Sequence, residues 1–169
     1  MELIERIKKL YNLKLYYVWV YPLDEGTDNE LILDPCCIYF EFENHEYLKV
    51  IAIPGEGKIA VSIEEKIEYP SDIEFIFKID LRSYILKYPE TNYYLEKVGG
   101  VNTEIDGNRL ICEAIELSLY AEAYDKMKQN IFIYTNLYGL SIGGLDKKIY
   151  WIEGFYIPLY GDKVDERWF

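Results

Sequence analysis

The sequence predicts an α+β fold in which a mostly antiparallel sheet packs against one long helix and shorter helices. Three alternating apolar runs follow one another within residues 36–63, separated only by turn residues, and this pattern is typical of a β-meander. Apolar residues recur at three- and four-residue steps over residues 109–129, which predicts the long helix. Half of the 169 residues are hydrophobic, enough to bury one core. We therefore expect a single α+β domain over residues 1–169.

The segment before the meander predicts one helix and one long strand. Residues 2–12 place apolar side chains at helical spacing, which favours a short amphipathic helix ending near Asn12. Residues 15–21, LYYVWVY, are β-branched and aromatic and predict a strand that is apolar on both faces. The acidic run at 24–30 does not match the ligand order of a calcium-binding loop and favours a solvated turn. A short strand is expected at 31–33.

The meander alternates core and surface positions along three strands. Every second residue of 38–42 and of 59–63 is apolar, and the run at 47–53 lies between them. Turns at 43–45 and 54–57 join the three strands. One face of the meander is expected to be core and the other to carry a mixed polar surface.

Between the meander and the long helix, the pattern predicts three further elements. A strand is expected at 73–79, because apolar residues alternate there. A helix is expected at 81–88, with apolar residues at helical spacing. A second short helix is expected at 93–98, closing at Gly99 and Gly100.

The clearest helical pattern covers residues 109–129, with Asn108 as its N-cap and Lys126 and Lys128 in its last turn. Its apolar positions are Leu110, Ile111, Ala114, Ile115, Leu119, Ala123 and Met127.

Four strands are predicted after the helix, at 131–135, 140–142, 148–153 and 155–160. Pro158 would place the last of them at an edge of the sheet. The tail KVDERWF ends in two aromatic residues and is expected to dock on the body or on a partner.

No motif in the sequence predicts catalysis or a cofactor. His45 is the only histidine and falls in the predicted turn at 43–45, where a backbone role is typical. The patterns HExxH, CxxC and GxxxxGK[ST] do not occur. We expect a protein that is not an enzyme and that uses no cofactor or metal ion.

The cysteines and the N-terminal segment bear on location. Cys36 and Cys37 are adjacent, so on a strand they would point to opposite faces and are poorly placed for a disulfide with each other. The segment MELIERIKKL lacks the apolar centre of a secretion signal, and no run approaches about 18 apolar residues. A cytoplasmic protein that does not contact membranes is expected.

The charge of the chain limits its partners. There are 30 acidic residues against 18 basic ones, a formal charge of −12. Such a field repels nucleic-acid phosphates and anionic lipids and attracts a basic protein. A net charge of this size also simply keeps a small domain soluble, so the charge alone does not establish a binding role. The 18 tyrosines suit both strands and interfaces.

An acidic, tyrosine-rich small domain without catalytic motifs is similar in kind to the immunity and inhibitor proteins that neutralise basic bacterial toxins such as nucleases. The resemblance rests on composition over the whole chain. It implies that acidic side chains occlude a basic active site while aromatic anchors supply tight contacts. The side chains expected to carry the charge are Glu41, Glu43, Glu46, Glu64, Glu65, Glu68, Asp72 and Glu74.

Two other functions stay open on the sequence. The chain could be a structural or regulatory domain of a homo-oligomer, pairing through an exposed strand edge such as 155–160. It could also bind a small molecule in a pocket between the long helix and the sheet. An acidic patch beside exposed tyrosine or tryptophan side chains would favour the inhibitor, and evenly spread acidic residues would count against it.

Overall fold

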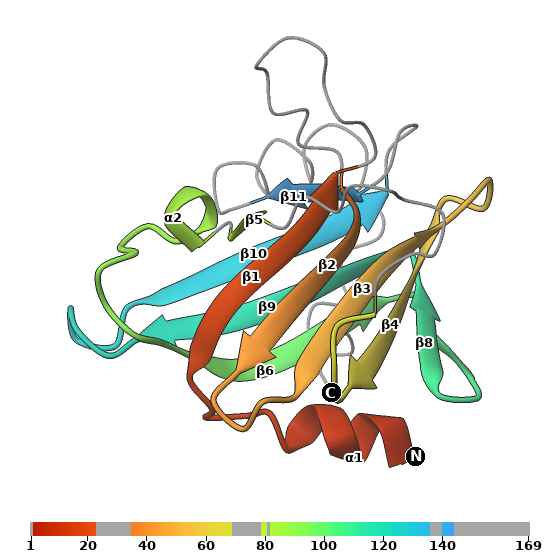
Figure 1. Ribbon diagram of the computed structural model, residues 1–169. Coiled ribbons are helices and arrows are strands. Elements are labelled where there is room, and N and C mark those ends of the chain that lie inside the picture. The colour runs from red at the N-terminus through yellow and green to blue at the C-terminus, as the bar shows by residue number, and fades with distance from the viewer. Residues whose placement is uncertain (1, 23–34, 69–78, 81, 136–139, 144–169) are drawn as a thin grey trace, which may run out of the picture.

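A computed structural model describes residues 2–22, 35–68, 79–80, 82–135 and 140–143. Within these ranges the chain forms two antiparallel sheets packed face to face, with 58% of residues in strands and 9% in helices (Figure 1). The predicted α+β fold is therefore wrong, because the described residues contain no long helix for the sheet to pack against. The second layer of the fold is another sheet.

The larger sheet has seven strands in the order β5-β1-β2-β3-β4-β8-β7, and each neighbouring pair is antiparallel. The predicted meander forms its centre as β2, β3 and β4. The strands of this sheet are β1 (Leu15–Pro22), β2 (Pro35–Phe42), β3 (Tyr47–Ile53), β4 (Lys58–Glu64), β5 (Ile79–Asp80), β7 (Glu104–Asp106) and β8 (Arg109–Cys112).

The smaller sheet has four strands in the order β11-β10-β9-β6, also antiparallel. It lies behind the larger sheet in Figure 1, with its strands running obliquely to β1 to β4. Its strands are β6 (Tyr93–Val101), β9 (Ala114–Ala121), β10 (Lys128–Thr135) and β11 (Leu140–Gly143). The strands predicted at 131–135 and 140–142 correspond to β10 and β11.

Within the described ranges, two short helices accompany the sheets. The predicted N-terminal helix is present as α1 (Glu2–Lys8), and α2 (Arg82–Ile85) lies within the helix predicted at 81–88. Leu3 and Ile7 of α1 are buried in the core, and the helix lies across one end of the sandwich (Figure 1). It thus closes the open end between the two sheets.

The core fills the space between the inner faces of the sheets. Alternate residues of β1 to β4 meet alternate residues of β6, β9 and β10, as the period of a strand requires. Phe40 and Phe42 are the largest apolar side chains that the larger sheet buries there, and each contributes about 2 kcal/mol by leaving water. The smaller sheet contributes Leu95, Ile115 and Ile133 among others.

The helix predicted at 109–129 is wrong: this segment forms β8, β9 and the start of β10. β9 is the reason the pattern misled, because it lies between β6 and β10 and is buried on both faces. A strand buried on both faces shows a continuous apolar run instead of alternation, and such a run also fits helical spacing. Alanine, leucine and glutamate in this segment added helical propensity that the sheet context overrides.

The short helix predicted at 93–98 is also wrong, because these residues begin β6. The pairing of β6 with β9 shifts between Leu95 and Lys97, which marks a β-bulge at Glu96. The extra residue separates the core positions Leu95 and Val98 by three instead of two. This spacing resembles one turn of a helix.

Several predicted elements lie outside the described residues. They are the strands at 31–33, 148–153 and 155–160, all of the predicted strand at 73–79 except Ile79, and the tail KVDERWF.

Candidate functional site

The outer face of the larger sheet gathers aromatic and acidic side chains in one place. Register places Tyr17 opposite Glu41, Glu41 opposite Tyr47, and Tyr47 opposite Glu64, so the four form a row across β1, β2, β3 and β4. We call these four residues the Glu41 row. They occupy the face opposite the core, since their neighbours Val18, Phe40, Leu48 and Ile63 point into it. Figure 1 shows β1 to β4 in front of the smaller sheet, with this face toward the viewer.

A second row of the same face lies next to the first. It consists of Trp19, Tyr39, Lys49 and Ser62 on the same four strands. Together the two rows form what we call the aromatic–acidic face. It carries four aromatic rings, two carboxylates and one lysine, so its charge is net negative.

Glu41 is held at the centre of this face by two neutral donors. The indole Nε1–H of Trp19 donates to Glu41 Oε2 at 2.7 Å, and the hydroxyl of Tyr47 donates to Glu41 Oε1 at 3.3 Å. None of the ion pairs found among the described residues includes Glu41. The carboxylate is therefore fixed in position while its negative charge has no basic partner in the described part of the chain.

The aromatic rings around Glu41 are packed against one another. Tyr17 stacks on Trp19 with ring centroids 4.7 Å apart and an interplanar angle of 27°, and Tyr39 meets Tyr47 edge-on at 6.2 Å. Tyr17 is 41% exposed, whereas Tyr39 is 1% exposed. The face is thus open to solvent at Tyr17 and closed at Tyr39.

The segment after β4 closes the face at Tyr39. Ile67 packs against a small hydrophobic cluster of Cys37 and Tyr39 outside the main core, and the Tyr39 hydroxyl donates to the backbone oxygen of Glu68 at 3.3 Å. This burial raises the pKa of Tyr39 well above its usual value of 10. Lys49 places its ammonium 5.6 Å from the centre of the Tyr39 ring, a cation–π contact.

The structure separates the predicted acidic residues into two groups. Glu41 and Glu64 lie on the aromatic–acidic face, where Glu64 Oε1 accepts a hydrogen bond from Ser62 Oγ at 2.6 Å. Glu68 reaches this face through its backbone oxygen, and Glu65 is exposed. Asp72 and Glu74 lie outside the described residues.

Glu43 and Glu46 do not join the others, because partners within the chain hold them at the turn between β2 and β3. Glu43 Oε1 accepts from the backbone N–H of Lys14 at 3.1 Å. Glu46 lies 3.7 Å from the Arg6 guanidinium and accepts from Asn44 Nδ2 at 2.6 Å. Their carboxylates stabilise the turn and its contact with the N-terminal segment.

Sequence reasoning assigned most of the aromatic residues to the core and missed the partners of Glu41. The signal lay in the run at 15–21, where Tyr17 and Trp19 alternate with Val18 and Val20. The valines point into the core, so the two aromatic rings must share the other face.

His45 has the backbone role expected of a turn residue. Its φ is +63°, in the left-handed region that histidine tolerates better than most residues, and its N–H donates to Phe42 O at 2.9 Å. Among the described residues, no three histidine, cysteine, aspartate or glutamate side chains are arranged to hold a metal ion. None of the helices in the described ranges is both long and apolar enough to cross a membrane.

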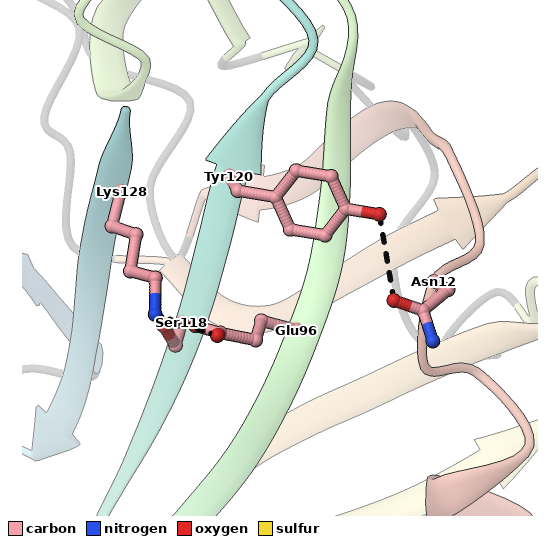
Figure 2. A network of polar contacts seen from close by, with 5 residues as sticks. All are labelled: Asn12, Glu96, Ser118, Tyr120 and Lys128. Atoms are coloured by element: carbon pink, nitrogen blue, oxygen red, sulfur yellow. Dashed lines mark hydrogen bonds and ion pairs between the residues drawn. The ribbon is translucent and has the colours of Figure 1, made fainter. Parts of the chain in front are cut away.

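The outer face of the smaller sheet carries a contrasting polar network (Figure 2). Glu96 accepts from Lys128 Nζ at 2.7 Å and from Ser118 Oγ at 2.9 Å, and the Lys128 hydrogen bond lowers the pKa of Glu96. Beside it, the Tyr120 hydroxyl donates to Asn12 Oδ1 at 3.4 Å. The Glu96 charge is neutralised within the chain, so this network ties strands together and offers no charge to a partner.

Comparison of the chain with protein-family models, with curated proteins and with solved structures returned no match.

Proposed function

We propose that this chain is a non-enzymatic binding protein whose aromatic–acidic face docks onto a basic protein, in the manner of an immunity or inhibitor protein that neutralises a basic toxin or nuclease. The observation that carries the proposal is the Glu41 carboxylate. It is fixed by Trp19 and Tyr47, lies beside the exposed ring of Tyr17, and forms no ion pair among the described residues.

Physical principles favour a protein partner for such a face. Interfaces concentrate their binding energy in tyrosine, tryptophan and arginine, often near the centre of the contact. A carboxylate that is already oriented loses little entropy on binding. The charge of −12 would speed the approach of a basic partner and would oppose binding to nucleic acid.

A cytoplasmic location belongs to the same proposal. Cys112 carries a free thiol that is fully buried, which suits a reducing compartment. A protein that protects its own cell from a toxin would act there before the toxin is exported.

The test is the affinity of the full-length chain for the protein encoded by the gene immediately upstream. We expect a toxin-like basic protein that binds with an affinity that falls as salt rises. A variant carrying both Tyr17→Ala and Glu41→Gln should bind at least about tenfold more weakly, which corresponds to about 1.4 kcal/mol. Surface plasmon resonance at two salt concentrations measures both effects.

The matched control is Glu104→Gln, which removes the same charge from an exposed position on β7, at the far edge of the same sheet. It should bind as the unaltered chain does. An upstream product that is not basic, or one that shows no salt-sensitive binding, would rule the proposal out. Equal losses in the control and the double variant would show that overall charge, and not this face, attracts the partner.

A further inference from the structure

We infer that the Glu41 row receives an arginine side chain of the partner, with the guanidinium hydrogen-bonded to Glu41 and stacked on the ring of Tyr17. This inference rests on the proposed function and narrows the chemistry of its partner.

The Glu41 carboxylate can accept further hydrogen bonds. A carboxylate offers about four lone-pair positions, and in Glu41 one on each oxygen is taken, by the Trp19 indole and by the Tyr47 hydroxyl. Each oxygen therefore keeps room for one more donor. Two parallel N–H groups held in a plane match two oxygens of one carboxylate, and only guanidinium among the protein side chains supplies them.

The ring of Tyr17 provides an exposed aromatic surface beside Glu41. Tyr17 lies next to Glu41 across the β1–β2 pair and is 41% exposed, while Trp19 supports its ring at 4.7 Å. A ring held from one side presents a fixed π surface. Guanidinium is planar and weakly hydrated, so it stacks on such a surface at little cost, whereas an ammonium holds its water more strongly.

The two carboxylates of the Glu41 row are too far apart to share one basic group. Glu41 and Glu64 lie on strands two apart, which places them about 10 Å from each other along the row. One guanidinium cannot reach both. Glu64 is therefore left for a second basic group of the partner, and Glu41, with its flanking rings, sets the preference for arginine.

The experiment compares a hexa-arginine peptide with a hexa-lysine peptide of equal charge, binding to the full-length chain at fixed salt. We expect the arginine peptide to bind about fivefold or more tightly. The indole N–H signal of Trp19 in the ¹H–¹⁵N spectrum should move on titration, because this group donates to the same carboxylate. The Trp19→Phe variant identifies that signal among the three tryptophans.

Two variants and one control separate the possible outcomes. Glu41→Gln and, independently, Tyr17→Ala should remove the preference for arginine, while Glu104→Gln should keep it. Spectral dispersion like that of the unaltered chain shows that each variant is folded.

Equal, salt-sensitive affinities for the two peptides would overturn the arginine inference and leave a basic partner in place. A preference for arginine without movement of the Trp19 signal would place the site elsewhere and overturn it as well. Failure of both peptides to bind would overturn this inference, and failure of the upstream product to bind would overturn the proposed function.

Discussion

The Tyr11 hydroxyl forms hydrogen bonds with backbone groups of strand β6. Among the described strands β6 lies at an edge of the smaller sheet, and the Tyr11 hydroxyl accepts a hydrogen bond from Val98 N–H at 3.1 Å and donates to Val98 O at 3.5 Å. Three residues earlier on the same strand, Leu95 N–H donates to Leu13 O at 3.1 Å. These contacts satisfy backbone groups that would otherwise be available to another chain.

Replacing Tyr11 with phenylalanine should therefore destabilise the fold by about 1 kcal/mol, because Val98 N–H loses its acceptor while the ring stays. Urea unfolding measures the loss, and faster hydrogen exchange at the Val98 amide locates it. The control is Tyr16→Phe, which removes a hydroxyl that forms no hydrogen bond among the described residues. Equal stabilities of the two variants would contradict the role of the Tyr11 hydroxyl.

At the scale of single residues, the sequence identified Glu41 and Glu64 as acidic candidates but could not separate them from Glu43 and Glu46. The difference lies in partners that are distant along the chain: Lys14 is 29 residues from Glu43. Which carboxylates are satisfied depends on how the strands pair, and local spacing does not contain that information.

The hairpin between β9 and β10 contains an unusual backbone element. Tyr124, Asp125 and Lys126 have φ values of +59°, +56° and +56°, three consecutive residues in the left-handed region without a glycine. A non-glycine residue there costs about 1–2 kcal/mol, and asparagine and aspartate tolerate it best. Lysine has no such advantage.

Lys126→Gly should consequently stabilise the protein by about 0.5–1 kcal/mol, the relief of strain less the added freedom of glycine in the unfolded chain. Thermal or urea unfolding measures the gain. Lys126→Ala removes the same side-chain charge but keeps the Cβ, so it should give no gain. A glycine variant no more stable than the alanine variant would show that the turn is not strained at this position.

Prediction at the level of elements succeeded for the meander, where one face of each strand is solvated, and failed for β9, where both faces are buried. The meander alternates cleanly, because its outer face carries residues such as Glu41 and Lys49. β9 does not, since even Glu116 and Ser118 are almost fully buried on the face away from the core. A usable signal did exist at Gly107–Asn108, because two such residues between apolar runs are typical of a tight hairpin, here joining β7 to β8.

The whole molecule holds several ionisable groups that burial keeps neutral. Burial raises the pKa of Tyr11, Tyr39 and Tyr93, and raises the pKa of Cys112 to about 12 from a usual value of 9. In each case the unfolded chain loses its proton first as pH rises. The stability that this difference provides is complete below about pH 9 and declines as pH rises further through the folded-state values.

We therefore expect the urea midpoint to be unchanged between pH 7 and about pH 8.5 and to fall steadily above about pH 9.5. Absorbance at 295 nm should show that part of the 18 tyrosines ionises only as the protein unfolds. A midpoint that stays constant to about pH 11 would contradict the buried, neutral state of these groups.

At this scale the predicted sheet was right in its centre and wrong in its second layer. Neighbouring strands of the meander pair locally, so their order follows from short turns. The sandwich depends on β6, β9 and β10 forming a separate sheet. The apolar residues of β9 also fit helical spacing, so the sequence pattern did not reveal this second sheet.

The position of α1 also constrains the order in which the protein can fold. Its buried face meets β4 of one sheet and β6 of the other, so neither sheet alone can cover it. A seven-residue helix is unstable by itself in water. Although α1 precedes both strands in the chain, it becomes stable only after the two sheets have come together, and during synthesis its apolar residues stay exposed until β6 and its partner β9 have left the ribosome.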